Sequence, residues 1–225
     1  MKHPRSYQRR SASANRSDYE QLFIRRVHDL IKWGYDRLCA SAYATEEETD
    51  ITGDLAEAIE SILEYRNEDW MRFYRVYDDP PINESITAPR RKGKRRRRVD
   101  IKLDSSEVSP YTRFCFEAKR LGKGNPVSRH LGTKGLGCFL SDSYAGAERR
   151  GGMLGYVQSD DERSWATKID KAFTSSPQSF GLQARRNNFR LYQVSAQLHH
   201  TYVSEYRRTT DGKRLQIYHS FLIFH

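Results

Sequence analysis

Three residues on two neighbouring segments carry side chains suited to acid–base or metal chemistry. Asp100 lies in the segment VDIKL, and Glu117 and Lys119 lie in the segment FCFEAK. Apolar and polar residues alternate in both segments, which predicts two β-strands, and the Ser- and Pro-containing stretch between them favours a hairpin. Because side chains two positions apart share one face of a strand, Glu117 and Lys119 should lie side by side, and Asp100 can meet them there.

The same alternation places apolar side chains on the opposite face of both strands. On the first strand these are Val99, Ile101 and Leu103. The pattern therefore predicts one face that packs on a core and one face that presents the polar cluster.

Two carboxylates brought together repel one another, and burial is unfavourable for both unless a cation lies between them. Mg²⁺ prefers carboxylate oxygens and retains water molecules, one of which can act as a nucleophile, and Mn²⁺ has similar preferences. We therefore expect Asp100 and Glu117 to be metal ligands. Lys119 would lower the pKa of the attacking water or stabilise negative charge on a phosphorane.

The stretch VDIKLDSSEVSPYTRFCFEAK resembles the PD-(D/E)XK nuclease superfamily, the fold of many restriction endonucleases, with Asp100, Glu117 and Lys119 at the motif positions. The resemblance implies Mg²⁺-dependent hydrolysis of DNA phosphodiester bonds. It also implies a mixed sheet whose core opens with an acidic helix, followed by a strand hairpin and a helix. The proline of the family name is absent, since Val99 precedes Asp100. The alternative is a surface hairpin in which Asp100 and Lys119 form a cross-strand salt bridge.

A further acidic residue upstream has three candidates. EEETDITGDL resembles a Glu-x-x-Ile-Thr-x-x-Leu opening found in several branches of the superfamily, which selects Glu48. Helix geometry offers Glu60, near the boundary of the predicted apolar face, and Glu57, nearly opposite that face. After the motif, Gln158 on a predicted strand could hold a phosphate or a water, and His130 could reach a phosphate; both are alternatively ordinary surface residues.

Eight of the nine residues from 90 to 98 are basic, and only Val99 separates the run from Asp100. Such a run attracts phosphates and gives salt-sensitive affinity with little sequence preference. The residues expected to contact the nucleic-acid backbone are Lys94, Arg95, Arg96, Arg97 and Arg98. The alternatives are a solvated loop and a nuclear import signal on a structural protein.

The composition favours one folded, basic domain. The 225 residues carry a formal charge of +10 and include 37% hydrophobic and 12% aromatic residues. Basic, Ser-rich residues 1–17 are predicted to be a flexible arm, and residues 18–225 a single nuclease-like domain. Three widely spaced cysteines, the absence of a secretory signal and the absence of a long apolar run predict a cytoplasmic protein without a membrane span.

Periodic segments predict the order of the elements. Helical spacing predicts a helix over 18–43 and a second over about 51–66, and a third helix around Trp165. Strands are expected over 152–159 and in a terminal pair joined at Asp211 and Gly212. These elements together predict an α/β fold with a central mixed β-sheet flanked by helices and a restriction-endonuclease-like core.

Two classes of function fit these features. The first is a metal-dependent endonuclease acting on DNA, with RNA not excluded, in restriction or anti-phage defence, as a homodimer or as a subunit of a larger complex. The second is a basic nucleic-acid-binding module without catalysis on a degenerate nuclease fold. Loss of Mg²⁺-dependent cleavage on substitution of Glu117 or Lys119 would distinguish them.

Overall fold

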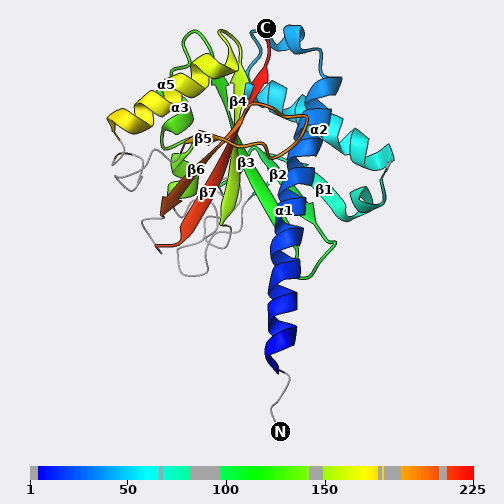
Figure 1. The fold of residues 1–225 in the computed structure, drawn as a ribbon. Helices are drawn as coiled ribbons and strands as arrows, with labels where there is room; N and C mark the ends of the chain where they lie inside the picture. Colours follow the sequence, from blue (N-terminus) through cyan, green and yellow to red (C-terminus); the bar gives the residue numbers. More distant parts are fainter. Residues whose placement is uncertain are drawn as a thin grey trace.

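The computed structural model describes residues 5–65, 68–81, 97–141, 149–176, 179, 189–207 and 212–225, and for residues 5–15 the backbone alone. Its centre is a seven-stranded mixed sheet in the order β1-β2-β3-β4-β7-β6-β5 (Figure 1). The strands are β1 (Tyr74–Asp78), β2 (Ile101–Ser105), β3 (Thr112–Leu121), β4 (Arg150–Val157), β5 (Arg190–Leu191), β6 (Thr201–Arg207) and β7 (Arg214–Ile223). The predicted α/β class with a central mixed sheet is confirmed.

Antiparallel hairpins form both sides of the sheet, and parallel pairs form its middle. Strands β1, β2 and β3 are antiparallel neighbours, and so are β7, β6 and β5. Strand β4 is parallel to both β3 and β7. The β2–β3 pair, in which Ile101 lies opposite Phe116, confirms the predicted hairpin, and the β6–β7 pair confirms the terminal one.

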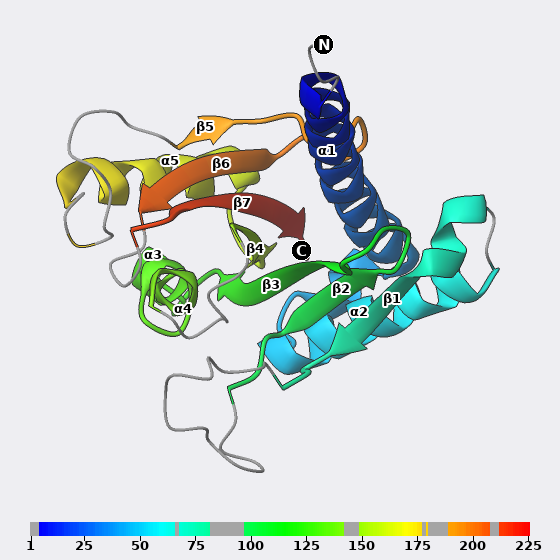
Figure 2. The same ribbon diagram turned by 90° about the horizontal axis from the view of Figure 1, so that it is seen from below.

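Helices cover both faces of the sheet, as Figure 2 shows from below. The long helix α1 (Arg5–Arg37) and helix α2 (Glu48–Tyr65) pack on one face, and α3 (Val127–Leu131), α4 (Gly137–Leu140) and α5 (Glu162–Ser175) pack on the other. Two short 3-10 helices, η1 (Ala40–Tyr43) and η2 (Asp69–Phe73), lie before α2 and β1. Each face of the sheet therefore has its own apolar core. No helix in the described ranges has the length and apolar character needed to cross a membrane.

Helix α1 differs from its predicted bounds of 18 and 43. It begins at Arg5 and ends at Arg37, and its first turns project beyond the sheet (Figure 1). Its core contacts begin at Tyr19 and Phe23. Because apolar periodicity reports only the turns that pack on a core, it could not show the turns before them. Whether residues 1–17 act as a separate arm remains a prediction.

The predicted alternation fails at Val99. Ile101 and Leu103 lie in the core under α1 and α2, but Val99 is buried in the core on the other face. The chain bends at Asp100, and Asp79 beside it has a φ of 42°, with its N–H bonded to the Asp100 carbonyl at 2.9 Å. The regular strand thus begins only at Ile101, and the bend turns Val99 to the opposite face.

Candidate active site

Helix α2 begins at Glu48, and two hydroxyl groups hold this helix start against the sheet. The Thr52 hydroxyl donates to the Glu48 carbonyl oxygen at 2.7 Å and lies 3.0 Å from the Tyr156 hydroxyl of β4. Thr52 has only one hydrogen to donate, so the Tyr156 hydroxyl is the donor in the second contact. Both side chains are buried, and they fix the Glu48 end of α2 beside the middle of the sheet.

Three carboxylates converge on the Lys119 ammonium group. Its Nζ lies 2.7 Å from Glu48 Oε1, 2.9 Å from Glu117 Oε1 and 3.8 Å from Asp100 Oδ2. With all three carboxylates ionised, one positive charge leaves two negative charges uncompensated within the cluster. Residues from three separate elements, α2, β3 and the segment before β2, therefore form one anionic site.

Backbone groups of β3 fix two of these carboxylates. The amide N–H of Ala118 donates to Asp100 Oδ2 at 2.6 Å, and that of Arg120 donates to Glu48 Oε2 at 3.2 Å. The Arg120 side chain also lies 2.7 Å from Glu47 and donates to the Glu46 carbonyl at 3.2 Å. The strand thus supplies amides on both sides of Lys119, which orient the carboxylates toward its ammonium group.

Burial of the four side chains is uneven. Glu117 and Lys119 are 8% and 11% exposed, whereas Asp100 and Glu48 are 29% and 30% exposed. Burial raises the pKa of Asp100 against the opposing effect of Lys119. Burial lowers the pKa of Lys119, but Glu117, Asp100 and Glu48 together raise it by more, and the net pKa is raised. Lys119 is therefore a fixed cation at neutral pH, with the site open to solvent at Asp100 and Glu48.

The other acidic and polar candidates lie away from the cluster. Glu57 and Glu60 are exposed on α2, and neither forms an ion pair with Lys119. The Gln158 side chain donates to the carbonyls of Tyr43 at 2.8 Å and Glu46 at 2.9 Å. Gln158 therefore braces the segment that leads into α2, and its amide nitrogen is already engaged.

Part of the basic run can be placed. Arg98 is exposed and forms an ion pair with Asp79, and Arg97 is half-buried. Both lie within three residues of Asp100 in the sequence, and the ion pair of Arg98 is with Asp79 rather than with the cluster. Lys94, Arg95 and Arg96 fall outside the described residues.

His130 is neither a surface residue nor a group exposed to substrate. It is fully buried on α3, where its Nε2 lies 3.3 Å from Nδ1 of His219 on β7. Nε2 of His219 lies 2.7 Å from the Ser204 hydroxyl. Burial lowers the pKa of His130 to about 3, so the pair is neutral inside the core. Nothing in the sequence around either histidine indicates this pairing, because 89 residues separate them.

The donor set suits a hard divalent cation. Three carboxylates from separate elements supply the oxygen ligands that Mg²⁺ prefers, and their excess negative charge would attract it. As the side chains stand, the described ranges contain no group of three or more His, Cys, Asp or Glu residues arranged to hold a metal ion, and Lys119 Nζ lies among the carboxylates instead. A metal ion would therefore compete with Lys119 for the same oxygens.

Sequence reasoning does not select Arg120 for this site, and it does not predict the contact between Thr52 and Tyr156, although Thr52 is the threonine of the Glu-x-x-Ile-Thr-x-x-Leu pattern. Thr52 follows Glu48 by four residues, which is one helical turn and could have served as a signal. Tyr156 and Arg120 stand in ordinary strand contexts.

Comparison of the chain with protein-family models, with curated proteins and with solved structures finds no match.

Proposed function

We propose that the protein is a metal-dependent nuclease that hydrolyses DNA phosphodiester bonds, using Mg²⁺ or Mn²⁺. The observation that carries the proposal is the convergence of Glu48, Asp100 and Glu117 on Lys119. A partly buried cluster with an excess of negative charge is unfavourable for folding alone. Such clusters are retained where a cation or a reaction requires them.

The order of elements supports the proposal. An acidic helix start at α2 is followed by η2 and β1, then by the hairpin strands β2 and β3 and by helix α3. Apart from the additional elements η2 and β1, this is the order that the resemblance to the PD-(D/E)XK superfamily implies. We therefore propose a restriction-endonuclease-like core, with restriction or anti-phage defence in the cytoplasm as its setting and a homodimer or a larger complex as its assembly.

Each residue of the cluster has a distinct role in this proposal. Asp100 and Glu117 would hold the metal ion, and Glu48 would act as a further ligand or orient the attacking water. The bound ion supplies a water of lowered pKa and a positive charge beside the phosphate. Lys119, whose pKa is raised, stays protonated and so stabilises the negative charge that develops on the phosphoryl oxygens. Arg97 and Arg98 contact the phosphodiester backbone.

One observation favours the second candidate, a nucleic-acid-binding module without catalysis. Lys119 already forms ion pairs with the cluster, as an internal cation would in a degenerate site. In that case the cluster has no catalytic role, and the basic residues alone carry the function.

Cleavage with and without metal separates the two candidates. Plasmid, linear and single-stranded DNA are incubated with the protein in Mg²⁺ or in EDTA, beside the variants Glu117→Gln and Glu57→Gln. We expect cleavage in Mg²⁺ only, lost in Glu117→Gln and retained in Glu57→Gln, whose side chain is exposed on the same domain. No cleavage of any substrate by the unmodified protein, with DNA binding intact, would establish the binding module instead.

A further inference from the structure

A second charged surface lies at the other end of the sheet from the candidate active site. On the face that carries α1, four adjacent strands each place one arginine, and the four arginines are staggered along the strands. Arg150 is the first residue of β4 and pairs in register with Gln216 of β7, and Arg214 lies two residues before Gln216 on the same face. The arginine row consists of Arg150, Arg190, Arg207 and Arg214.

The arginine row contains a repulsive contact. Arg207 of β6 and Arg214 of β7 are directly opposite one another in the antiparallel ladder, and both side chains are exposed. Like charges at directly opposed positions destabilise a sheet. Neither arginine has an ion-pair partner within the described residues. This arrangement is unfavourable for the folded chain alone and becomes favourable when an anion lies across the pair.

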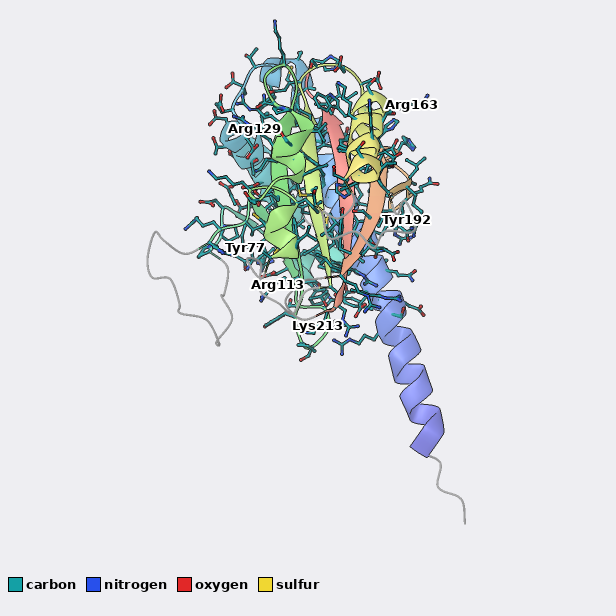
Figure 3. All side chains as sticks on the ribbon, turned by 90° about the vertical axis from the view of Figure 1, so that its left-hand side faces the viewer. Tyr77, Arg113, Arg129, Arg163, Tyr192 and Lys213 are labelled. Atoms are coloured by element: carbon teal, nitrogen blue, oxygen red, sulfur yellow. The ribbon has the colours of Figure 1, made fainter. Side chains whose placement is uncertain are left out.

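A groove of about 540 Å³ adjoins the arginine row at Arg150, between α1, strands β4 and β7 and the segment that follows β5. Its lining includes Arg25 of α1, Arg150 of the row and the aromatic side chain of Tyr192, which is 39% exposed. Figure 3 shows Tyr192 at mid-height on the right, and Lys213 at the lower end of the domain, away from Arg129 and Arg163 at the upper end. The amide side chains of the lining are Gln21, Gln193 and Gln216.

Acidic residues compensate only part of this charge. Glu20 lies 2.9 Å from Arg150, and Glu205 lies 3.5 Å from Arg190. Asp18 also lines the groove. Arg25 interacts electrostatically with Asp29, one turn further along α1. Arg207 and Arg214 have no ion-pair partner among the described residues, so an excess of positive charge remains around this pair.

We propose that this surface binds a single strand of nucleic acid, with phosphates on the arginine row and Arg25 and an unpaired base against Tyr192. An exposed ring beside cations is the combination that binds single strands, since the ring stacks on any base. Amide side chains can bond base edges. The groove has the volume of a site for one small ligand rather than for a duplex.

The proposed surface is distinct from the candidate active site. Gly155 of β4 lies opposite Lys119, and Arg150 is five residues earlier on the same strand. This separation is about 16 Å at 3.3 Å per residue. The strand-binding surface would hold nucleic acid whether or not the site at Lys119 cleaves it.

Binding without metal tests the proposal independently of any cleavage. Affinity for a fluorescent single-stranded oligonucleotide is measured by anisotropy in EDTA over a range of salt concentrations. Arg207→Gln/Arg214→Gln should bind at least tenfold more weakly at low salt, and the slope of log K against log salt should fall by about 1.4, for two lost phosphate contacts. Thermal stability should be unchanged or higher, because a repulsive pair has been removed.

Two matched comparisons sharpen the result. Arg163→Gln/Lys171→Gln removes two exposed charges from α5 on the other face and should bind almost normally. Tyr192→Ala should weaken binding about fivefold or more, while Tyr192→Phe, which keeps the ring, should not. Equal effects of the two double variants, or no difference between the two Tyr192 variants, would overturn the proposal. Absence of cleavage alone would count against the nuclease and leave the second surface standing.

Discussion

The Tyr156 hydroxyl donates a hydrogen bond to Thr52 across 3.0 Å, and so joins the first turn of α2 to the middle strand of the sheet. The two residues are 104 positions apart in the sequence. Thr52 in turn donates to the carbonyl of Glu48. The position of the Glu48 carboxylate therefore depends on a hydroxyl group that contacts neither substrate nor metal.

Tyr156→Phe should disturb the site more than the fold. Loss of one buried hydrogen bond should lower the free energy of unfolding by about 1 kcal/mol. Cleavage should fall further than this because Glu48 loses its anchor. Tyr35→Phe removes another tyrosine hydroxyl contact, the bond to the Ile223 carbonyl, and serves as the control. Denaturant unfolding and cleavage rates are measured for both variants. If Tyr156 were only structural, Tyr156→Phe and Tyr35→Phe would lose cleavage activity only in proportion to their loss of stability.

Glu48→Gln should reduce Mg²⁺-dependent cleavage about 100-fold or more, the usual effect of removing a group that stabilises the transition state. Glu60→Gln makes the same chemical change on the same helix but at an exposed position, and should keep near-normal rates. Single-turnover cleavage rates measure both. Equal loss in the two variants would show that the helix, rather than the Glu48 carboxylate, matters.

Lys119→Met should increase the affinity for Mn²⁺ while abolishing cleavage. The ammonium group and a divalent cation compete for the same three carboxylates, so removing the ammonium should tighten metal binding by at least tenfold, or about 1.4 kcal/mol. Titration calorimetry with Mn²⁺ measures this without any substrate. Lys123→Met, at an exposed position in the loop after β3, is the control for loss of charge. Unchanged or weaker Mn²⁺ binding in Lys119→Met would argue against a metal site among these carboxylates.

His28 should make the protein sensitive to mild acid. It is fully buried among Phe114, Phe116 and Tyr218, and burial lowers its pKa to about 4 against the effect of its bond to the Ile24 carbonyl. The unfolded chain binds this proton below about pH 6.5, the folded chain only below about 4. The free energy of unfolding should therefore fall as the pH drops through that window.

The size of this effect is about 3 kcal/mol for His28 alone. His28→Asn keeps a donor for the Ile24 carbonyl and does not titrate, so its stability should depend less steeply on pH between 6.5 and 4. His199→Asn, at an exposed position, should leave the pH dependence as it is. Urea unfolding at several pH values gives the slopes. Identical slopes for His28→Asn and the unmodified protein would contradict the expected role of burial.

Local pattern was sufficient to predict the hairpin of β2 and β3 and the shared face of Glu117 and Lys119, because alternation has a fixed period along a strand. The same reasoning failed at Val99, where the bend at Asp100 interrupts that period. It also predicted no strand over Tyr74–Asp78, although β1 pairs with β2 along its whole length. An edge strand with mixed burial carries a weak periodic signal in its sequence. Strand β1 is stabilised by pairing with β2, and local sequence does not encode that pairing.

The residues of the candidate site likewise fall into those that local sequence predicts and those that it does not. The three residues Asp100, Glu117 and Lys119 lie on neighbouring strands, so their proximity follows from pairing rules. Selecting Glu48 over Glu57 and Glu60 required a resemblance, because helix geometry alone offered two residues that do not contact Lys119. The contact of Tyr156 with Thr52 depends on how α2 packs on β4, and no local pattern encodes that packing.

Asp100 combines two roles that different substitutions should separate. Its carboxylate accepts the Ala118 N–H at 2.6 Å, where the bend at Asp100 interrupts the regular ladder. Asp100→Asn keeps an oxygen for that N–H, so it should lose cleavage with little loss of stability. Asp100→Ala leaves the N–H without its partner and should lower the free energy of unfolding by about 1–3 kcal/mol. Similar stability of the two variants in denaturant would show that the Ala118 bond does not contribute.

The bend at Asp100 also bears on how such a chain could change over evolutionary time. A descendant that no longer cleaved nucleic acid would still need an acceptor for the Ala118 N–H, so selection on folding would retain Asp or Asn there. Glu48 and Lys119 are more informative about the loss of catalysis. The two residues form an ion pair, so selection on both would relax at the same time once cleavage was no longer needed. Among descendants, coordinated loss of that pair would mark the lineages that abandoned catalysis, and persistence of an acidic residue at position 100 would not.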